Sequence, residues 1–186
     1  VQKRDFRRHL LEGRELRGLS VGIVGLGNVG RSVAERLIPF GCRLVGYDPY
    51  IEDSEFEELK GFERVDSLES LMSKVDLLTL HAKLNQENYH MIGADQFSYV
   101  KDGIYLVNAA RAALIDEAAL IDALDKGRVA FAALDVLEPE PPFDLPPDKH
   151  EYRHPLLEHP RTFVTPHIGA STEDAQRKIA VDLVEQ

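Results

Sequence analysis

Three polar residues in the second half of the sequence, Arg111, Glu140 and His167, are of types that can together move a proton and hold an anion. The ordinary pKa of histidine lies near neutral pH, so an imidazole can act as a general base in one direction and as a general acid in the other. A neighbouring carboxylate selects the tautomer of such a ring, and a guanidinium binds a carboxylate through parallel hydrogen bonds. The three residue types therefore suit acid/base chemistry on a small carboxylic acid.

Each of the three residues also has an ordinary structural interpretation. His167 follows Pro166 in the stretch TFVTPHIGAST, where a ring can simply close a turn. Arg111 can form a surface ion pair, and Glu140 can be a solvated loop acid. The choice between these readings depends on where the fold places the three side chains.

A glycine-rich segment provides the strongest single motif. Gly25, Gly27 and Gly30 in GLGNVG form the pattern GxGxxG between a predicted strand and a predicted helix, and Asp48 closes the next strand about 20 residues on. Gly25 allows a tight turn, Gly27 lets the backbone approach a pyrophosphate, and Gly30 lets the helix pack closely.

The acid at position 48 indicates which dinucleotide binds. N–H groups of Asn28 and Val29 at the helix start are expected to hold phosphate oxygens, helped by the helix dipole. Asp48 is expected to accept hydrogen bonds from the adenosine ribose hydroxyls, and its carboxylate would repel a 2′-phosphate. The segment therefore predicts NAD, rather than NADP, as cofactor.

The elements that position these residues alternate between apolar strands and helical patterns from Leu19 onward. LSVGIVG is a predicted strand, NVGRSVAERLIPF a helix ended by Gly41, and CRLVGYD the next strand. Asp66 and Glu69 have the spacing of a capping box at a later helix start, and Gly127 is a predicted helix end. This order predicts an α/β fold with a Rossmann-type doubly wound parallel sheet. The strands are apolar nearly throughout, so helices are expected on both faces, in three layers, α/β/α.

Ligands of open α/β sheets bind beyond the carboxyl ends of the strands, and polar residues recur at those positions here. They are Asp48, His81, Asn108 with Arg111, Asp135 with Glu140, and His167. Hydride transfer between a nicotinamide and a hydroxy acid requires a base, a carboxylate that orients it, and a group that holds the substrate. His167, Glu140 and Arg111 can fill these three roles.

Five segments of the chain resemble consecutive signatures of the D-isomer-specific 2-hydroxyacid dehydrogenases. They are GIVGLGNVGR, GYDPY, LVNAARAALIDEAALIDAL, AALDVLEPEPP and HPLLEHPRTFVTPHIGAST, within a region from Leu16 to about Thr172. The resemblance implies that Arg111 of NAAR is the catalytic arginine, that Glu140 before the proline of DVxxxEP assists catalysis, and that His167 of TPH is the general acid/base.

The same resemblance implies the rest of the cofactor site. Asp135 would bind the nicotinamide carboxamide, and His81 would line the ribose side of the pocket. The full set of expected NAD-binding residues is Gly25, Gly27, Asn28, Val29, Gly30, Asp48, Pro49, His81, Ala109, Ala110, Arg111, Asp135, His167 and Gly169. No metal is expected.

Two positions depart from the family pattern. Ala112 follows Arg111 where relatives usually have glycine, and alanine adopts a positive φ less easily. Lys83 stands where the family commonly has proline, and the proline-rich loop between positions 137 and 161 is longer than usual. These departures bear on the shape of the pocket and on the substrate.

Composition restricts the partners. The 186 residues include 22 Lys and Arg against 32 Asp and Glu, a net charge of −10, which disfavours nucleic acid and anionic lipid. Cys42 is the only cysteine, so an intramolecular disulfide is impossible and the cytoplasm is the expected compartment.

No apolar run reaches the roughly 18 residues of a membrane span. Homodimers through the cofactor domain are typical of the family.

Relatives in this family have the cofactor domain inserted into a smaller substrate domain. Residues 1–186 are therefore expected to form a single NAD-binding domain, with 1–18 and 172–186 as helices leading to a substrate domain that this chain lacks. We expect the chain to bind NAD and to turn over 2-hydroxy or 2-keto acids poorly. Two alternatives remain open at this point: an NAD-sensing interaction module of the corepressor type, and another NAD-dependent Rossmann enzyme.

Overall fold

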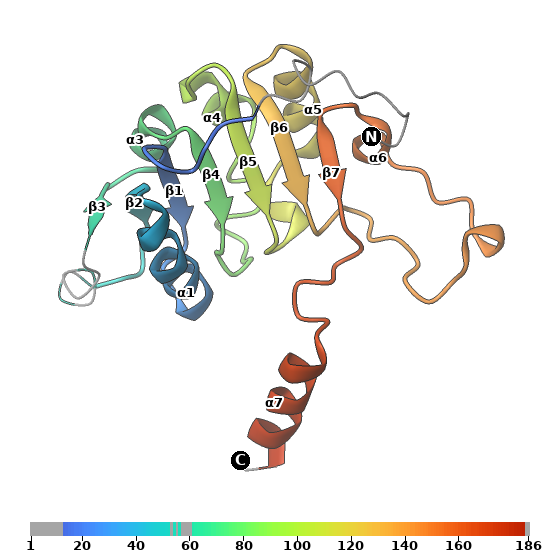
Figure 1. Cartoon of the computed structure of the whole chain (residues 1–186). Helices are drawn as coiled ribbons and strands as arrows, with labels where there is room; N and C mark the ends of the chain where they lie inside the picture. Colours follow the sequence, from blue (N-terminus) through green and yellow to red (C-terminus); the bar gives the residue numbers. More distant parts are fainter. Residues whose placement is uncertain (1–12, 53, 55, 57–60, 185–186) are drawn as a thin grey trace.

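Seven parallel strands form one sheet, in the order β3-β2-β1-β4-β5-β6-β7 (Figure 1). The computed structural model describes residues 13–52, 54, 56 and 61–184. The strands are β1 (Ser20–Val24), β2 (Arg43–Tyr47), β3 (Phe62–Arg64), β4 (Leu77–Leu80), β5 (Ile104–Asn108), β6 (Val129–Leu134) and β7 (Thr162–Val164). The predicted parallel, doubly wound sheet is thus confirmed.

Helices lie on both faces of this sheet, as expected. They are α1 (Asn28–Leu37), α3 (Leu68–Lys74), α4 (Ala94–Tyr99), α5 (Glu117–Asp125), α6 (Pro155–Glu158) and α7 (Glu173–Val184), with the 3₁₀ turns η2 (Ile38–Phe40), η3 (Ala112–Leu114) and η4 (Pro147–Lys149). Successive residues of β1 point to opposite faces: Val24 packs with the side chains of α3 and α4, whereas Val21 and Ile23 pack with Ala34 of α1.

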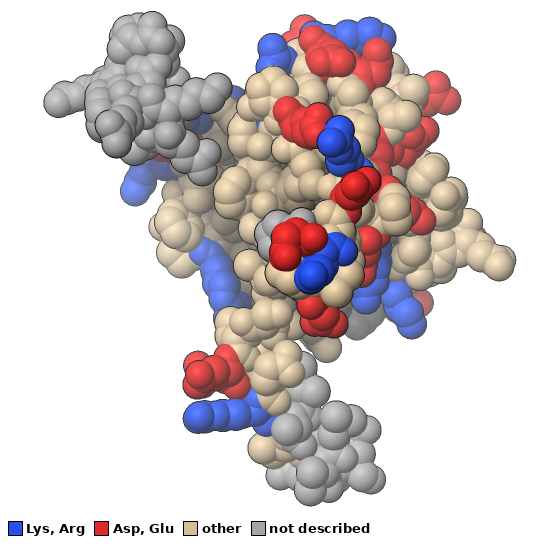
Figure 2. All heavy atoms as spheres, turned by 90° about the vertical axis from the view of Figure 1, so that its right-hand side faces the viewer, with Lys and Arg blue, Asp and Glu red and all other residues tan. Residues whose placement is uncertain are grey.

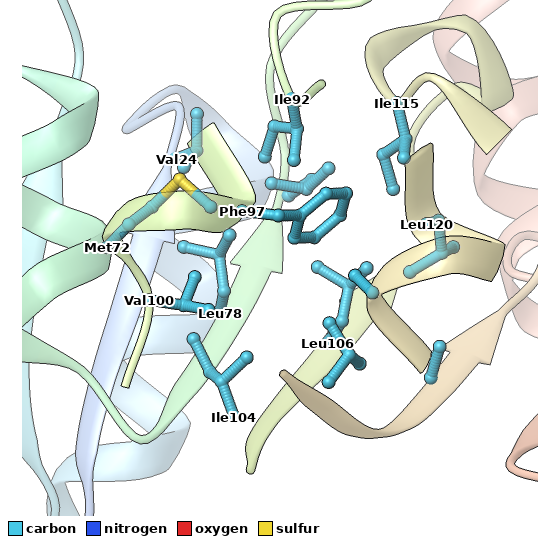
Figure 3. Close-up of a cluster of buried hydrophobic side chains, with 14 of the residues drawn as sticks. Val24, Met72, Leu78, Ile92, Phe97, Val100, Ile104, Leu106, Ile115 and Leu120 are labelled. Atoms are coloured by element: carbon cyan, nitrogen blue, oxygen red, sulfur yellow. The ribbon is translucent and has the colours of Figure 1, made fainter. Parts of the chain in front are cut away.

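The larger core lies between the sheet and the helices α3, α4 and α5. Figure 3 shows its centre, where Phe97 of α4 lies among aliphatic side chains from the strands and from α3 and α5. Leu78, Leu106 and Leu120 are at most 2% exposed there. Fully burying a side chain of this size stabilises the fold by about 1.5–3 kcal/mol, so this core fixes the strand ends on which the polar residues sit.

The opposite face is less well covered at β5–β7. Phe131 of β6 pairs in register with Tyr105, and Phe163 of β7 pairs with Ala133. Phe131 is 37% and Phe163 61% exposed. Helices therefore cover this face over β1 and leave it partly open at β5–β7, within the part of the chain that the structure describes.

Helix ends follow local side-chain chemistry. Gly127 adopts the left-handed conformation, φ 75°, just beyond α5, which confirms the predicted stop. Thr172 caps α7, since its Oγ1 accepts a hydrogen bond from Ala175 N. The capping prediction at α3 was wrong by one residue: Ser67, rather than Asp66, is the cap and accepts from Ser70 N at 3.1 Å.

The two chain ends differ in what can be said of the predicted linking helices. Positions 1–12 of the first one lie outside the described residues, and 13–18 form a loop and a turn instead of a helix. The second forms α7, which extends away from the sheet (Figure 1).

On the side of the molecule nearest β7 and α6, acidic and basic side chains are interspersed (Figure 2). A search of the described helices for one long and apolar enough to cross a membrane found none.

Candidate active site

The cofactor motif lies at the point where the strand order reverses. β1 pairs with β2 on one side and with β4 on the other, and the chain crosses between them. A cavity of about 900 Å³ opens there, beyond the carboxyl ends of the strands. Its walls include five of the predicted cofactor residues, namely Gly25, Gly27, Asp48, Pro49 and His81. This is the position at which doubly wound sheets bind nucleotides.

The three glycines have distinct roles. Gly25 has φ +87°, and a Cβ added to it would lie 2.6 Å from Ala82 N. A Cβ at Gly30 would overlap with the carbonyl of Gly25, so the start of α1 packs directly on the turn. A Cβ at Gly27, by contrast, would have nothing within 4 Å. Gly27 is the N-cap residue of α1, and no side chain of the described residues forms a capping hydrogen bond there. The open space beside the N–H groups of this helix start suits a pyrophosphate.

Asp48 ties the end of β2 to the glycine turn. Its Oδ2 accepts a hydrogen bond from Leu26 N at 2.8 Å, and its Oδ1 accepts one from Tyr50 N at 2.9 Å. A carboxylate oxygen has a second lone pair, so each can still accept a hydroxyl. The residue therefore shapes the loop and keeps the capacity to bind a ribose.

His81 lines the same cavity from the end of β4. Its Nε2 lies 3.0 Å from Oγ1 of the buried Thr79. Burial lowers the pKa of His81, because the charged ring would lose its hydration, so the ring is neutral at neutral pH.

Asn108 organises the loop that carries Arg111. Its side chain is buried at the end of β5, where Oδ1 accepts from Ala110 N at 3.0 Å and Nδ2 donates to the Arg111 carbonyl at 2.9 Å. Ala112 begins the 3₁₀ turn η3, which requires negative φ, so alanine fits where the family pattern has glycine. The guanidinium of Arg111 donates to the Ala110 carbonyl at 2.6 Å and, in the described part of the chain, forms no ion pair.

Asp135, at the end of β6, holds the loop that contains His167. Its Oδ1 accepts from the Thr165 hydroxyl and from Ile168 N, and its Oδ2 accepts from Gly169 N at 2.8 Å. Burial raises the pKa of this carboxyl, but these hydrogen bonds and the nearby His167 outweigh that effect, and the pKa lies below its ordinary value. The side chain is thus a charged anchor for the loop.

His167 and Glu140 form a pair across 27 positions of sequence. Nδ1 of His167 lies 2.8 Å from Oε1 of Glu140. A carboxylate accepts, so Nδ1 carries the proton and Nε2 of the neutral ring is left with its lone pair. His167 has φ 53°, a conformation in which histidine is enriched relative to most residues, and its N–H donates to the Thr165 carbonyl. The backbone of His167 therefore closes a turn, and its ring is held by Glu140 as a base.

A second, smaller cavity of about 230 Å³ lies beside this pair. Asp135, Glu140 and His167 line it together with apolar side chains of the proline-rich loop. The ring of Phe143 meets that of His167 edge to face, with 6.1 Å between centroids.

The predicted residues thus divide into two groups. Gly25, Gly27, Asp48, Pro49 and His81 surround the large cavity, and Asp135, Glu140, His167 and Gly169 meet at the end of β6 and β7. The remaining predicted residues line neither cavity: they are Asn28, Val29 and Gly30 at the start of α1, and Ala109, Ala110 and Arg111 after β5.

Sequence reasoning missed part of the wall of the large cavity. Tyr50 OH donates to Glu87 Oε2 at 2.6 Å and so links the loop after β2 to the loop after β4. Lys83, which the sequence did single out as bearing on the pocket, also lines this cavity. The positions of these residues just beyond strand ends were the available signal. Among the described residues, no group of three His, Cys, Asp or Glu side chains is arranged to hold a metal ion.

Comparison with known proteins gives a consistent assignment. The family of the D-isomer specific 2-hydroxyacid dehydrogenase NAD-binding domain matches residues 1–169. D-3-phosphoglycerate dehydrogenase of Methanocaldococcus jannaschii is 40% identical over 186 residues, 100% of this chain and 34% of the relative.

Two crystal structures extend the comparison. A D-lactate dehydrogenase of Treponema pallidum superposes with a TM-score of 0.86 at 37% identity, over 100% of this chain and 56% of that one. The D-lactate dehydrogenase of Aquifex aeolicus, solved with NAD and lactic acid, gives 0.82 at 30% identity, over 95% of this chain and 54% of that one. This chain therefore spans between a third and somewhat more than half of these relatives. It belongs to the D-isomer specific 2-hydroxyacid dehydrogenase family and matches the NAD-binding domain of that family.

Proposed function

We propose that this chain is the cofactor-binding and acid/base half of an enzyme that transfers a hydride between NAD(H) and a D-2-hydroxy acid or its 2-keto acid. The observation that carries the proposal is the 2.8 Å contact between His167 Nδ1 and Glu140 Oε1. It places an oriented imidazole beside the carboxyl ends of the strands, at the edge where the cofactor cavity opens.

His167 exchanges the substrate proton at Nε2. In the oxidation direction, Nε2 takes the hydroxyl proton while the hydride leaves carbon, and Glu140 stabilises the imidazolium that forms. NAD, when bound, would accept this hydride, and NADH would supply it in the opposite direction. In the reduction direction, Nε2 returns the proton to the carbonyl oxygen. Arg111 holds the substrate carboxylate, for which its guanidinium turns away from the Ala110 carbonyl.

The cofactor occupies the large cavity. Asn28 and Val29 bind the pyrophosphate through their N–H groups, and Asp48 accepts from the adenosine ribose. Pro49 and His81 line the walls of that cavity, while Ala109, Ala110, Asp135 and Gly169 extend the site toward the nicotinamide. The carboxylate of Asp48 makes NAD the cofactor rather than NADP.

A second domain completes the site. α7, which extends away from the sheet, is the helix that leads toward it. Because that domain would exclude water and orient the substrate, residues 1–186 by themselves bind NAD with little turnover. A steady-state assay in which this chain alone shows full activity would refute this part of the proposal.

The acid/base assignment is tested in the longer protein that contains this chain. His167→Asn removes the proton carrier, so kcat for 2-keto acid reduction falls by about 10²–10⁴-fold while NAD affinity stays within a few-fold. His159→Asn is the matched control, since His159 lines neither cavity. Unchanged turnover in His167→Asn would refute the assignment, and turnover that requires ammonia would indicate an amino-acid dehydrogenase instead.

The assembly is a homodimer in the cytoplasm. The exposed Phe131 and Phe163 form an apolar face that a second copy can cover, and the free thiol of Cys42 fits a reducing compartment. Phe163→Ser is expected to shift the protein toward monomer in sedimentation velocity. A dimer of unchanged affinity would place the interface elsewhere.

A further inference from the structure

Three side chains other than His167 and Glu140 form hydrogen bonds to the backbone of residues 138 and 139. The N–H of Glu138 donates to Oε1 of Glu117, at 3.1 Å, and its carbonyl accepts from Nε2 of His154, at 3.2 Å. The hydroxyl of Tyr152 donates to the Pro139 carbonyl at 2.6 Å. Glu140, which pairs with His167, follows directly. Three successive backbone groups before Glu140 are therefore bonded to side chains that are distant in sequence.

Glu117 and His154 form one hydrogen-bonded unit, in which the ring of His154 is buried. His154 is 6% exposed, and Leu156 N–H donates to its Nδ1 at 3.2 Å. The neutral ring must then carry its proton on Nε2, which donates to Oε2 of Glu117 at 3.0 Å as well as to the Glu138 carbonyl. One carboxylate thus binds the Glu138 N–H with one oxygen and the ring of His154 with the other.

Glu140 depends on this backbone for its direction. Its side chain is 46% exposed, and in the described part of the chain its carboxylate forms one hydrogen bond, to His167. No other side chain orients it. Because a half-exposed glutamate otherwise samples several rotamers, the position of its backbone decides whether the carboxylate meets Nδ1.

We propose that Glu117 and His154, assisted by Tyr152, are positioning residues for the His167–Glu140 pair. They bond the backbone of residues 138–139 so that Glu140 faces Nδ1 of His167 and selects the tautomer with Nε2 free. Their role in catalysis rests on the proposed function, but their effect on the orientation of Glu140 and His167 can be tested without substrate.

Two substitutions of His154 separate positioning from helix capping. Asparagine can copy Nδ1 and keep the bond from Leu156 N, but it does not reach Glu117. Glutamine can copy Nε2 and keep the bonds to Glu117 and Glu138, but it loses the cap. Positioning therefore predicts that His154→Gln retains the His167 tautomer and that His154→Asn loses it, whereas a purely structural capping role predicts the reverse.

Glu117→Gln offers an independent, nearly isosteric test. In either orientation of the amide, one of the two bonds made by the Glu117 carboxylate is lost, because an NH₂ group faces a donor. Two controls match these variants. Asp122→Asn removes an exposed acid from the same helix. His159→Asn removes a ring whose Nδ1 accepts from Arg161 N and whose Nε2 meets Asp125, so in the described part of the chain its hydrogen-bond partners do not include residues 138–140.

The readout is the ¹⁵N NMR spectrum of the imidazoles in the 186-residue chain, at a pH where the ring of His167 is neutral. We expect the ratio of the Nδ1–H to the Nε2–H tautomer of His167 to fall by about tenfold in Glu117→Gln and in His154→Asn, a factor typical of one hydrogen bond to a charged group. Exchange protection of the Glu138 amide is expected to fall by a similar factor in Glu117→Gln. Both controls and His154→Gln should keep the wild-type ratio.

An unchanged tautomer ratio in folded Glu117→Gln and His154→Asn would overturn the positioning proposal. So would a loss in His154→Gln with retention in His154→Asn. Neither result depends on turnover. Failure of the longer protein to reduce 2-keto acids, with the tautomer shifts as expected, would instead refute the proposed function.

Discussion

Asp135→Asn isolates the anchor that holds the His167 loop. The wild-type carboxylate accepts three hydrogen bonds, from Thr165, Ile168 and Gly169. Asparagine has the same shape but only one acceptor oxygen, so at least one backbone N–H is left facing an NH₂ group. The remaining two bonds go to a neutral oxygen instead of a charged one.

The magnitude follows from these bonds. A hydrogen bond to a charged group contributes about 1.5–3 kcal/mol, against about 1 kcal/mol for a neutral one. Removing one and weakening two should lower the free energy of unfolding by at least about 2.5 kcal/mol at pH 7. Urea denaturation followed by circular dichroism measures this difference. Asp122→Asn, which breaks an exposed pair with Lys126, is the control and should change stability by less than about 1 kcal/mol.

The pH dependence provides a second check. The pKa of Asp135 is lowered in the folded state, so the unfolded chain binds the proton first as the pH falls. The stabilisation is therefore fully present above the unfolded pKa of about 4 and is lost as the pH drops through the folded pKa. The gap between wild type and Asp135→Asn must narrow below about pH 4. A gap under about 0.5 kcal/mol at pH 7, or one that stays constant down to about pH 3, would refute the anchor role.

Three further substitutions test single elements of the site. Gly27→Ala adds a Cβ to open space, so the free energy of unfolding should change by no more than about 1 kcal/mol. The NAD affinity measured by calorimetric titration should fall at least about tenfold, because the Cβ would occupy the space for the pyrophosphate. Unchanged affinity would place the pyrophosphate elsewhere. Ala112→Gly should lose about 0.5–1 kcal/mol in thermal unfolding, because η3 needs no positive φ, and a gain would contradict this account. The pKa of His81 is lowered in the folded state, so the unfolded chain takes up the proton first and wild-type stability should fall as the pH drops below about 6.5. In His81→Gln this part of the pH dependence should disappear. A stability curve of His81→Gln that runs parallel to the wild-type curve would count against burial of His81 as the cause.

The cofactor half of the site could be predicted from sequence because it is built locally. The glycine turn, the start of α1 and the end of β2 lie within a short stretch, and their conformation follows from Gly25, Gly30 and Asp48. Hydrophobic periodicity likewise predicted the strands and helices that carry them. The prediction of helix caps from local residue types was wrong only in detail, since Ser67 rather than Asp66 caps α3.

The catalytic half could be predicted only as a set of residue types. The contact between Glu140 and His167 joins positions 27 residues apart, across a proline-rich loop without regular periodicity. Ala112 shows the same limit: the family pattern indicated a need for positive φ, but the 3₁₀ turn that removes this need depends on Asn108 and the surrounding backbone. The hydrogen bonds by which Asp135 holds the His167 loop could not be predicted from residue types either, because two of its three partners are backbone N–H groups.

The geometry of the acid/base pair is set from two independent sides. Asp135 accepts from the Thr165 hydroxyl before His167 and from the backbone N–H groups of Ile168 and Gly169 after it, which holds His167 at positive φ. Glu117 and His154 bond the backbone before Glu140. The pair itself is half exposed and has one hydrogen bond to keep it together. Both anchors act on the same 2.8 Å contact between His167 and Glu140. Losing either anchor therefore already disrupts most of this contact, and little of it is left for the second loss to disrupt. Their effects on the His167 tautomer are therefore expected to be less than additive, unlike their effects on stability, which arise from separate sets of hydrogen bonds.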